Sequence, residues 1–321
     1  MKVKTISLLM ILCLFFSACG SQKSVESPLT SDAGITFTDD LGRRVTVDNP
    51  KRVAPLLGSF AQVWMLAGGT VHATAEDAWD DLCLDLPASA INLGHTKKLS
   101  LELLLEAEPD FILASVNTRQ QVEWRETLEA TGIPVAYFDI SDFDDYLRLL
   151  SICTDITGQK ELYEKNGILV QKQIEEVLRQ RKIRLENQEP PTVLSLVASA
   201  GNVYVKNSKD NVLGEMLHRL GCINIADSDS LLLENLSLER ILQADPDYIF
   251  FVRRGDDEEG MRQYVRQMML ENPAWGQLSA VQNNRVYFME KNLYNLKPNH
   301  RWGEAYEKLE AIFQDNQGGN R

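Results

Sequence analysis

The sequence predicts an α/β protein with two Rossmann-like lobes, each built on a mainly parallel sheet, joined by a single long α-helix. Three observations support this: a 17-residue element occurs twice, short apolar runs alternate with amphipathic helical segments, and a charged stretch with helical spacing separates the halves. The 321 residues suffice for two domains, and 44% hydrophobic with 25% charged residues is typical of a globular chain.

The N-terminus predicts a signal peptide over residues 1–18. Lys2 and Lys4 precede an apolar run, residues 6–16, that is shorter than the roughly 20 residues needed to cross a bilayer. The segment 16–19, Phe-Ser-Ala-Cys, resembles a lipobox, although lipoboxes prefer Leu where Phe16 stands. We therefore expect Cys19 to be lipidated and to anchor the chain to the outer face of the cell membrane. An ordinary secretory signal is the alternative. Residues 19–35 are polar and predict a flexible tether.

Residues 36–141 predict the N-terminal α/β lobe. Two β-rich segments, 35–38 and 44–47, flank Asp-Asp-Leu-Gly and favour a hairpin. A buried strand over 52–57 then leads through Gly58 to an apolar helix over 60–67, which ends at a Gly pair. Residues 133–138 form another apolar run after a helical segment. Strands alternating with helices predict parallel pairing with right-handed crossovers.

The duplicated element covers residues 99–115 and 236–252. Nine of the seventeen aligned positions are identical. Ser100 and Ser237 occupy N-cap positions, Pro109 and Pro246 end the helices, and a continuous apolar run follows each proline. Each copy therefore predicts a helix followed by a buried strand. A spacing of 137 residues is too long for a solenoid and indicates two similar lobes.

Residues 142–188 predict the interlobe helix. Apolar positions recur at helical spacing among many charges, with a break expected near Gly158 and an end at Pro190-Pro191. From residue 159 onward such a helix would span roughly 40 Å. We expect it to limit lobe motion; a helical hairpin within one domain is the alternative. Residues 189–321 predict the C-terminal α/β lobe, with strands at 192–197 and 285–289 and a helix at 212–220.

Charge and motifs narrow the classes of function. A net charge of −13 disfavours nucleic-acid binding. The chain lacks the G-x-S-x-G, Walker A, H-E-x-x-H and G-x-G-x-x-G motifs, and its four histidines do not pair at ligand spacing, so we expect no enzyme and no cofactor. Cys83, Cys153 and Cys222 are scattered and predict small buried side chains rather than a disulfide framework.

Several motifs together carry a family resemblance. They are the lipobox, Asp39-x-x-Gly42-Arg43 followed by Pro-Lys-Arg-Val, the duplicated element, the long helix, and the tail 292–306. Over residues 36–312 the chain resembles substrate-binding lipoproteins of ABC importers for iron-siderophores, haem and vitamin B12. The resemblance implies a monomeric extracytoplasmic receptor. It would bind an iron complex in an interlobe cleft and deliver it to a permease dimer with its ATPase.

The ligand and the class of protein leave alternatives. A siderophore complex leads, with haem or a corrinoid as alternatives. A metal-handling enzyme on a related two-lobed fold would need clustered Cys or paired His, and a surface adhesin or sensor that has lost the transporter is a third possibility.

Glu102 and Glu239 occupy equivalent positions in the two copies of the element. In the family that the chain resembles, such acids dock onto arginines of the permease, so we expect both on one surface of the molecule. The alternative is a glutamate favoured by the dipole at a helix start.

The candidate ligand-binding residues follow the expected carboxyl ends of the strands. Their cations suit an anionic chelate, and the aromatic rings of Trp79, Tyr204 and Tyr294 could stack on a ligand. They are Ser59, Phe60, Trp79, His95, Arg119, Tyr204, Lys206, Arg253, Arg254, Tyr294, Lys297 and Arg301. His95 stands where haem-binding relatives often carry a metal-ligating Tyr, so it would be a metal ligand only if the ligand is haem.

Overall fold

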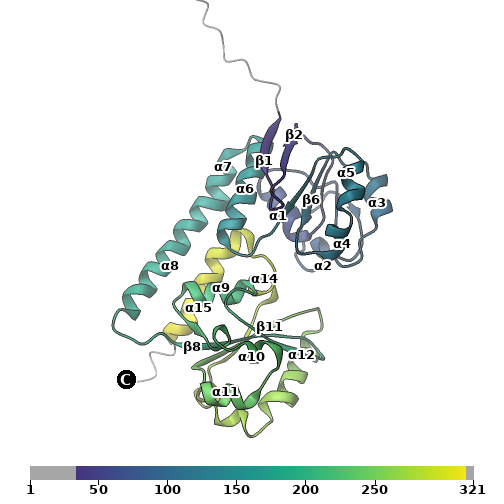
Figure 1. Cartoon of the computed structure of the whole chain (residues 1–321). Coiled ribbons are helices and arrows are strands. Elements are labelled where there is room, and N and C mark those ends of the chain that lie inside the picture. Colours follow the sequence, from purple (N-terminus) through teal and green to yellow (C-terminus); the bar gives the residue numbers. More distant parts are fainter. Residues whose placement is uncertain (1–33, 316–321) are drawn as a thin grey trace, which may run out of the picture. The chain divides into compact units, whose positions relative to one another are not determined.

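The structure is a computed structural model that describes residues 34–315 (Figure 1). The signal peptide and Cys19 lie outside the described residues, as does the predicted tether apart from its last two residues. Within the described range, no helix has the length and apolar character needed to cross a membrane. The fold class is confirmed: helices alternate with strands, and the two principal sheets are mainly parallel.

The first lobe carries a parallel sheet in the order β3-β6-β7, whose residues are all buried. The predicted hairpin β1–β2 is antiparallel, and β4 pairs parallel with β5. The elements are β1 (Ile35–Thr38), β2 (Arg44–Val47), β3 (Val53–Pro55), α1 (Gly58–Leu66), β4 (Ala73–Thr74), α2 (Asp77–Asp80), β5 (Ile91–Asn92), α3 (Leu101–Glu106), β6 (Phe111–Ser115), α4 (Arg119–Glu123), α5 (Arg125–Ala130) and β7 (Val135–Phe138).

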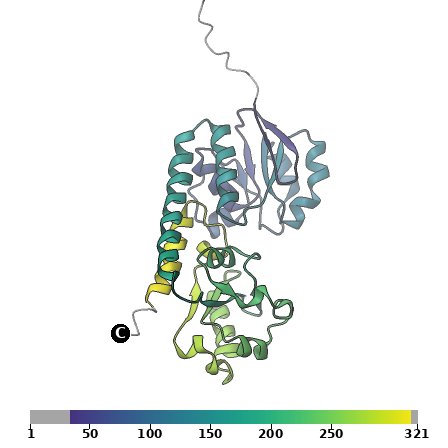
Figure 2. The same ribbon diagram turned by 60° about the vertical axis from the view of Figure 1, so that its left-hand side comes forward.

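The connector between the sheets breaks at Gly158, as the sequence predicted, and a long helix follows the break; the residues before the break form a separate helix, so the connector as a whole is not a single helix. The helix α6 (Phe143–Thr157) starts at a capping box made by Asp142 and Asp145, and it ends at Gly158, whose φ of 72° is left-handed. The chain reverses at Gly158 and residue 159, and α7 (Lys160–Tyr163), a π-helical turn, Glu164–Ile168, and α8 (Leu169–Leu185) then form one continuous helix. Because the Tyr146 hydroxyl donates to the carbonyl of Asn166 at 2.8 Å, α6 is paired with this turn. The helix α6 therefore forms a hairpin with the first part of this long helix, and the rest of the same helix, α8, continues toward the second sheet (Figure 2).

The second lobe carries a sheet in the order β10-β8-β11-β12, all parallel, with β9 antiparallel to β8. Its elements are β8 (Thr192–Ala198), β9 (Val203–Lys206), α9 (Val212–Arg219), β10 (Ile223–Asn224), a 3₁₀ turn (Ile225–Asp227), α10 (Ser230–Glu234), α11 (Leu238–Ala244), β11 (Tyr248–Arg253), α12 (Glu258–Val265), a π-helical turn (Arg266–Leu270), a 3₁₀ turn (Trp275–Gln277), α13 (Ser279–Gln282), β12 (Val286–Met289), α14 (Lys291–Tyr294), a 3₁₀ turn (Asn299–Arg301) and α15 (Trp302–Asp315).

The duplicated element has the same backbone in both lobes. The hydroxyl of Ser100 accepts from the backbone N–H of Leu103 in α3, and that of Ser237 accepts from the N–H of Arg240 in α11. The predicted N-caps are confirmed. In each copy the residue before the proline has left-handed φ, so the helix stops there and the buried strand begins.

One aspartate after each proline ties the buried strand to its neighbour. Asp110 accepts from the backbone N–H groups of Lys51 and Arg52, both at 2.8 Å, just before β3. Asp247 accepts from the backbone N–H and the hydroxyl of Thr192, both at 2.8 Å, at the start of β8. The shared Pro-Asp pair thus sets the register of the central strands β6 and β11 against their neighbours.

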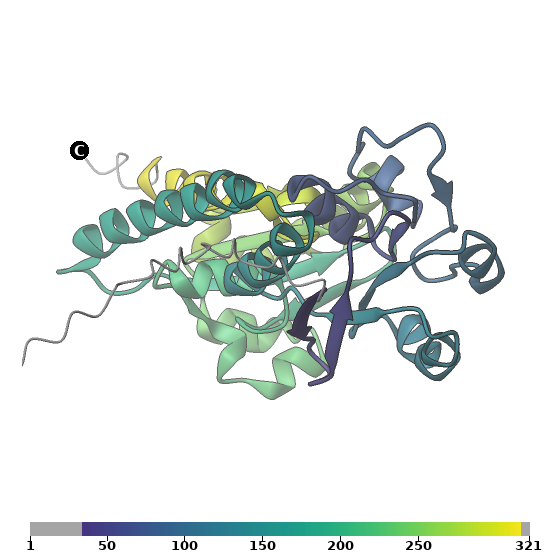
Figure 3. The same ribbon diagram turned by 90° about the horizontal axis from the view of Figure 1, so that it is seen from above.

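The C-terminal helix α15 packs along α8, as Figure 3 shows from above. A Cβ at Gly303 would lie 2.0 Å from the side-chain oxygen of Gln173, so the two helices approach closely at this glycine. The fully buried Trp302 packs edge-on against Phe143 of α6, with ring centroids 6.1 Å apart. The chain thereby returns from the second lobe to the helical hairpin beside the first.

Candidate ligand cavity

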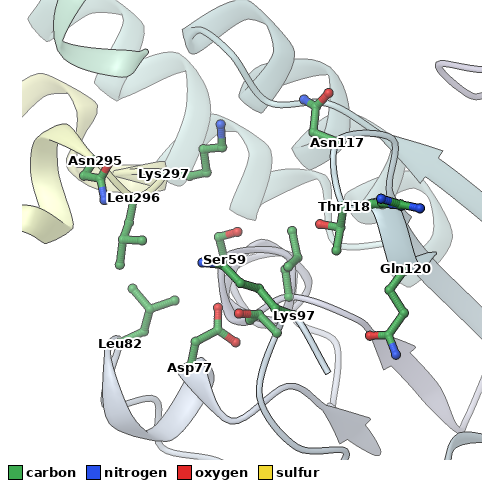
Figure 4. A pocket seen from close by; sticks show the side chains of 13 residues that line it. Ser59, Asp77, Leu82, Lys97, Asn117, Thr118, Gln120, Asn295, Leu296 and Lys297 are labelled. Atoms are coloured by element: carbon green, nitrogen blue, oxygen red, sulfur yellow. The ribbon is translucent and has the colours of Figure 1, made fainter. Parts of the chain in front are cut away.

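A cavity of about 520 Å³ lies at the carboxyl ends of the first lobe's strands (Figure 4). Its walls come from the loops after β3, β5 and β6, from the starts of α1, α2 and α4, from the turn that follows α2, and from a segment after α14. The lining residues are Leu57, Ser59, Asp77, Leu82, Thr96, Lys97, Asn117, Thr118, Arg119, Gln120, Asn295, Leu296 and Lys297. This is the edge at which ligands bind in open α/β sheets, and the size suits a small molecule.

Three cations and one carboxylate make up the charged part of this lining. Lys97 and Arg119 come from the first lobe and Lys297 from the second, whereas Asp77 is the acid. Arg119 is 92% exposed and its Nε lies 2.7 Å from Glu123, so its charge is partly neutralised. The lining therefore carries a positive excess, although the whole chain is acidic.

Burial shifts two of these groups toward their neutral forms. Loss of hydration raises the pKa of Asp77 to about 6, against the opposing effect of the backbone N–H of Gly58, which donates to its Oδ1 at 2.9 Å. Loss of hydration also lowers the pKa of Lys297, against the nearby acids Asp139 and Asp145. Shifted titrating groups that face a cavity are typical of binding sites.

The uncharged lining is polar and aliphatic, and none of the thirteen residues is aromatic. Leu82 and Leu296 point toward one another from the two lobes (Figure 4). The amide of Gln120 both accepts from the backbone N–H and donates to the carbonyl of Leu99, so its role is structural. Ser59, Asn117 and Thr118 bring hydroxyl and amide groups to the cavity.

Three of the twelve predicted ligand-binding residues line this cavity: Ser59, Arg119 and Lys297. Two predicted aromatic residues belong to the core instead. Phe60 is 1% exposed because α1 turns it into the hydrophobic cluster, and Tyr294 is 1% exposed with its hydroxyl donating to the carbonyl of Ala305 at 3.0 Å. Neither ring can reach a ligand in this arrangement.

Trp79 and His95 lie in the correct segments but do not line the cavity. Trp79 is partly buried within α2, and the lining residue of that helix is Asp77. His95 is exposed, and its Nδ1 accepts from the backbone N–H of Lys97 at 3.3 Å. Among residues 34–315 no group of three or more His, Cys, Asp or Glu could hold a metal ion.

The remaining candidates of the second lobe also lie outside the cavity lining. Tyr204 and Lys206 lie on β9, an antiparallel strand that the sequence did not predict, and Tyr204 is 47% exposed. Arg253 donates to the carbonyl of Asp256, Arg254 is exposed, and Arg301 pairs with Glu304 at 2.7 Å. Of the second-lobe residues up to 315, only 295–297 line the cavity.

Sequence reasoning missed Asp77 and Lys97 as individual residues. Gly58 is the residue that could have indicated Asp77. A Cβ at Gly58 would lie 2.7 Å from the backbone nitrogen of Ala78, so α1 and α2 approach closely at this glycine. Asp77 lies at the same contact, where its Oδ1 accepts from the N–H of Gly58 at the start of α1. An aspartate at this junction must be drawn toward the strand edge. Lys97 follows His95 by two residues in the same loop. No pattern in the sequence shows which of the two side chains lines the cavity.

The two candidate docking acids are exposed and occupy the first turns of their helices, Glu102 in α3 and Glu239 in α11. Exposed apolar side chains adjoin them: Leu103 is 40% exposed and Leu236 is 39% exposed.

The cysteine prediction is partly wrong. Cys153 and Cys222 are buried as expected, but Cys83 is exposed, and its φ of 48° places it in a left-handed turn. All three are free thiols.

Residues 53–293 match the model of a family described as periplasmic binding protein. The chain belongs to the periplasmic binding protein family. Members of this family bind solutes outside the cytoplasm for transport and work with the permease and ATPase of an ABC importer, so the chain is an extracytoplasmic solute-binding protein and not an enzyme.

Two curated relatives of this periplasmic binding protein come from Bacillus subtilis. One is the Fe(3+)-citrate-binding protein YfmC, 24% identical over 91% of this chain and 90% of the relative. The other is an iron-uptake system-binding protein, 24% identical over 97% and 96%.

Solved structures support the same fold. Staphylococcus aureus SirA complexed with staphyloferrin B aligns at 18% identity with a TM-score of 0.65, covering 88% of this chain and 98% of SirA. The vitamin B12 binding protein BtuF of Vibrio cholerae aligns at 16% identity with a TM-score of 0.67, covering 84% and 98%.

Proposed function

We propose that this periplasmic binding protein is the lipid-anchored receptor of an ABC importer and binds an anionic ferric chelate in the cavity. The observation that carries the proposal is the composition of the lining, which contains three cationic side chains and one carboxylate. Carboxylate-bearing chelates of iron would place their negative oxygens against the ammonium groups of Lys97 and Lys297 and the guanidinium of Arg119. Both curated relatives are named for iron binding, one of them for ferric citrate.

Haem and corrinoids are the alternative ligands, and the cavity favours them less. Large flat rings bind best between apolar or aromatic walls, and haem iron takes an axial His, Tyr, Met or Cys. The lining has aliphatic side chains in Leu57, Leu82 and Leu296, but none of its thirteen residues is aromatic and none is His, Tyr, Met or Cys. A metal-handling enzyme gains no support either, since the described residues contain no cluster of metal-ligating side chains.

Delivery to the permease would use the two exposed acids. Glu102 and Glu239 present carboxylates from equivalent helix starts, and a permease built from two like subunits could meet them with two arginines. Such contacts speed association and fix orientation more than they add affinity. We propose that the receptor acts as a monomer, tethered through Cys19 and the polar residues that follow it.

Protein purified from its native host tests the ligand class. Absorbance and metal analysis should reveal iron without a Soret band. Titration of the emptied protein should then show tight binding of ferric citrate or a carboxylate siderophore complex and weaker binding of haem and cobalamin. A Soret band or a stoichiometric cobalt signal in the purified protein would replace the proposal with the haem or corrinoid alternative.

A further inference from the structure

The segment 291–299 of the second lobe is held against the first lobe at both of its ends. At the first end, Nζ of Lys291 lies 2.5 Å from Oδ1 of Asp81 and 2.6 Å from Oδ1 of Asp256. The side-chain amide of Asn292 donates to the carbonyl of Asp81 at 2.9 Å. Asp81 follows α2 in the first lobe, whereas Asp256 belongs to the loop after β11 in the second, so one ammonium group joins the two lobes.

At the second end, Asn299 contacts helix α1. Its side-chain amide donates to the carbonyl of Ser59 at 3.0 Å and to Oε1 of Gln62 at 2.8 Å. Asn299 is fully buried, and its φ of 52° is left-handed, a conformation that Asn adopts more readily than most residues. These contacts fix both the side chain and the backbone at this point.

Between the two ends lie residues 295–297, which are the part of the second lobe, as far as the structure describes it, that lines the cavity. The contacts at both ends also involve the first-lobe segments that line the cavity, since Asp81 precedes the lining residue Leu82 and Ser59 itself lines it. The position of Lys297 across the cavity therefore depends on attachments that do not involve the ligand.

The ion pair between Lys291 and Asp81 is largely shielded from water, which strengthens it. Only 7% of the Lys291 side chain and 23% of the Asp81 side chain are exposed, so water competes weakly for the pair. Burial alone would lower the pKa of Lys291, but the hydrogen bonds with Asp256 and Asp81 more than offset it and raise that pKa. The ammonium therefore stays charged at neutral pH.

We propose that Lys291 is a positioning residue whose ion pair with Asp81 clamps the 295–297 wall onto the first lobe before a ligand arrives. The ligand then enters a cavity that is already formed, and an importer that separates the lobes must break this pair to release it. The part that concerns ligand affinity rests on the proposed function, whereas the part that concerns lobe geometry does not.

Asp81 and Asp256 form a matched pair for the test. Both carboxylates contact Nζ of Lys291, but only the contact with Asp81 joins the two lobes. Spin labels at the exposed positions 126 and 243, in the mature protein with Cys83→Ser, report the distance between lobes by pulsed dipolar spectroscopy without ligand. We expect a narrow distribution for the parent and for Asp256→Asn, and a broadened or shifted one for Asp81→Asn and Lys291→Met.

Titration with ferric citrate supplies the second readout. Asp81→Asn should weaken binding by about tenfold or more, and Asp256→Asn by less than about threefold. Equal distance distributions for Asp81→Asn and Asp256→Asn, whether narrow or broad, would overturn the clamp. A parent protein that binds no ferric complex would instead refute the proposed function and leave the distance measurement to decide the clamp. Lys291→Met gives the same distance test should Asp81→Asn fail to fold.

Discussion

Arg181 on α8 and Glu310 on α15 form an ion pair with only 4% of each side chain exposed and Nε 3.6 Å from Oε2. Arg184 also donates to Glu310, and Nε of Arg181 donates to the carbonyl of Leu220 at 3.0 Å. The guanidinium of Arg181 stacks over the ring of Phe313, 4.3 Å from its centroid. The link between the lobes is thus α8 braced by α15, which makes it stiffer than a lone helix.

Glu310→Gln should destabilise the protein strongly, because it leaves two guanidinium groups beside each other without their buried counter-charge. We expect a loss of about 3–5 kcal/mol in the free energy of unfolding, measured by urea denaturation. Glu176→Gln, which removes an exposed partner of Arg179, is the control and should cost less than about 1 kcal/mol. Similar losses for the two variants would contradict the brace.

Asp77→Asn should change how stability depends on pH. Burial raises the pKa of Asp77 to about 6, so the folded state binds this proton more tightly than the unfolded state does. The charged carboxylate therefore destabilises the fold above pH 6, and the penalty fades as the pH falls from 6 toward 4. Asn can still accept from Gly58, so the variant should be more stable than the parent at pH 8 by on the order of 1–3 kcal/mol.

The same residue should make ligand binding depend on pH. Protonation of Asp77 removes the negative charge from the lining. Binding of an anionic ferric chelate should therefore tighten as the pH falls from 7.5 to 5.5. The affinity should rise by up to about tenfold for each unit by which the ligand raises the pKa of Asp77. With Asp77→Asn this tightening should disappear once pH changes of the chelate itself are subtracted. A pH profile that the substitution leaves unchanged would show that Asp77 does not sense the ligand.

Glu102→Ala combined with Glu239→Ala should leave ligand affinity unchanged and abolish stimulation of the transporter's ATPase in vesicles. Neither residue lines the cavity, and both are exposed at helix starts. The matched control replaces Glu106 and Glu234, which are also exposed glutamates in helices α3 and α10. Undiminished stimulation by the Glu102/Glu239 variant would reject the docking role.

Cys83 should be the thiol of the folded region that alkylates readily. Burial raises the pKa of Cys153 and raises that of Cys222 to about 12, so their thiolates are scarce and shielded, whereas Cys83 is exposed. Iodoacetamide treatment followed by peptide mass spectrometry should find label at Cys83 first, with the other two modified only after denaturation. Rapid labelling of Cys153 or Cys222 would contradict the packing around them.

The sequence predicted well those helices and strands whose ends are set by neighbouring residues in the chain. Serine caps, proline stops and apolar runs each act locally, so the duplicated helix and strand could be located from residues such as Ser100 and Pro109 alone. The connector was predicted in part: the break near Gly158 and the long helix after it are confirmed, but no local pattern indicates that α6 packs back against the start of that helix.

The cavity was predicted by segment but not by side chain. Strand order and the carboxyl-edge rule indicated the right loops, yet the direction of each side chain depends on helix packing. Tyr294 turns toward α15 and Phe60 into the core, whereas Asp77 reaches the cavity because it accepts from Gly58. The ion pair between Lys291 and Asp81 joins residues that are 210 positions apart in the sequence, so no local pattern predicts it.

Isothermal titration of ferric citrate into Lys297→Met and Lys98→Met tests the central claim that this cavity holds an anionic iron complex. Lys297 lines the cavity from the second lobe, whereas Lys98 is exposed and outside the lining. Lys297→Met should weaken binding of ferric citrate by about 10- to 100-fold, and Lys98→Met should bind it like the parent. Equal affinity of both variants and the parent for ferric citrate would place the ligand outside this cavity.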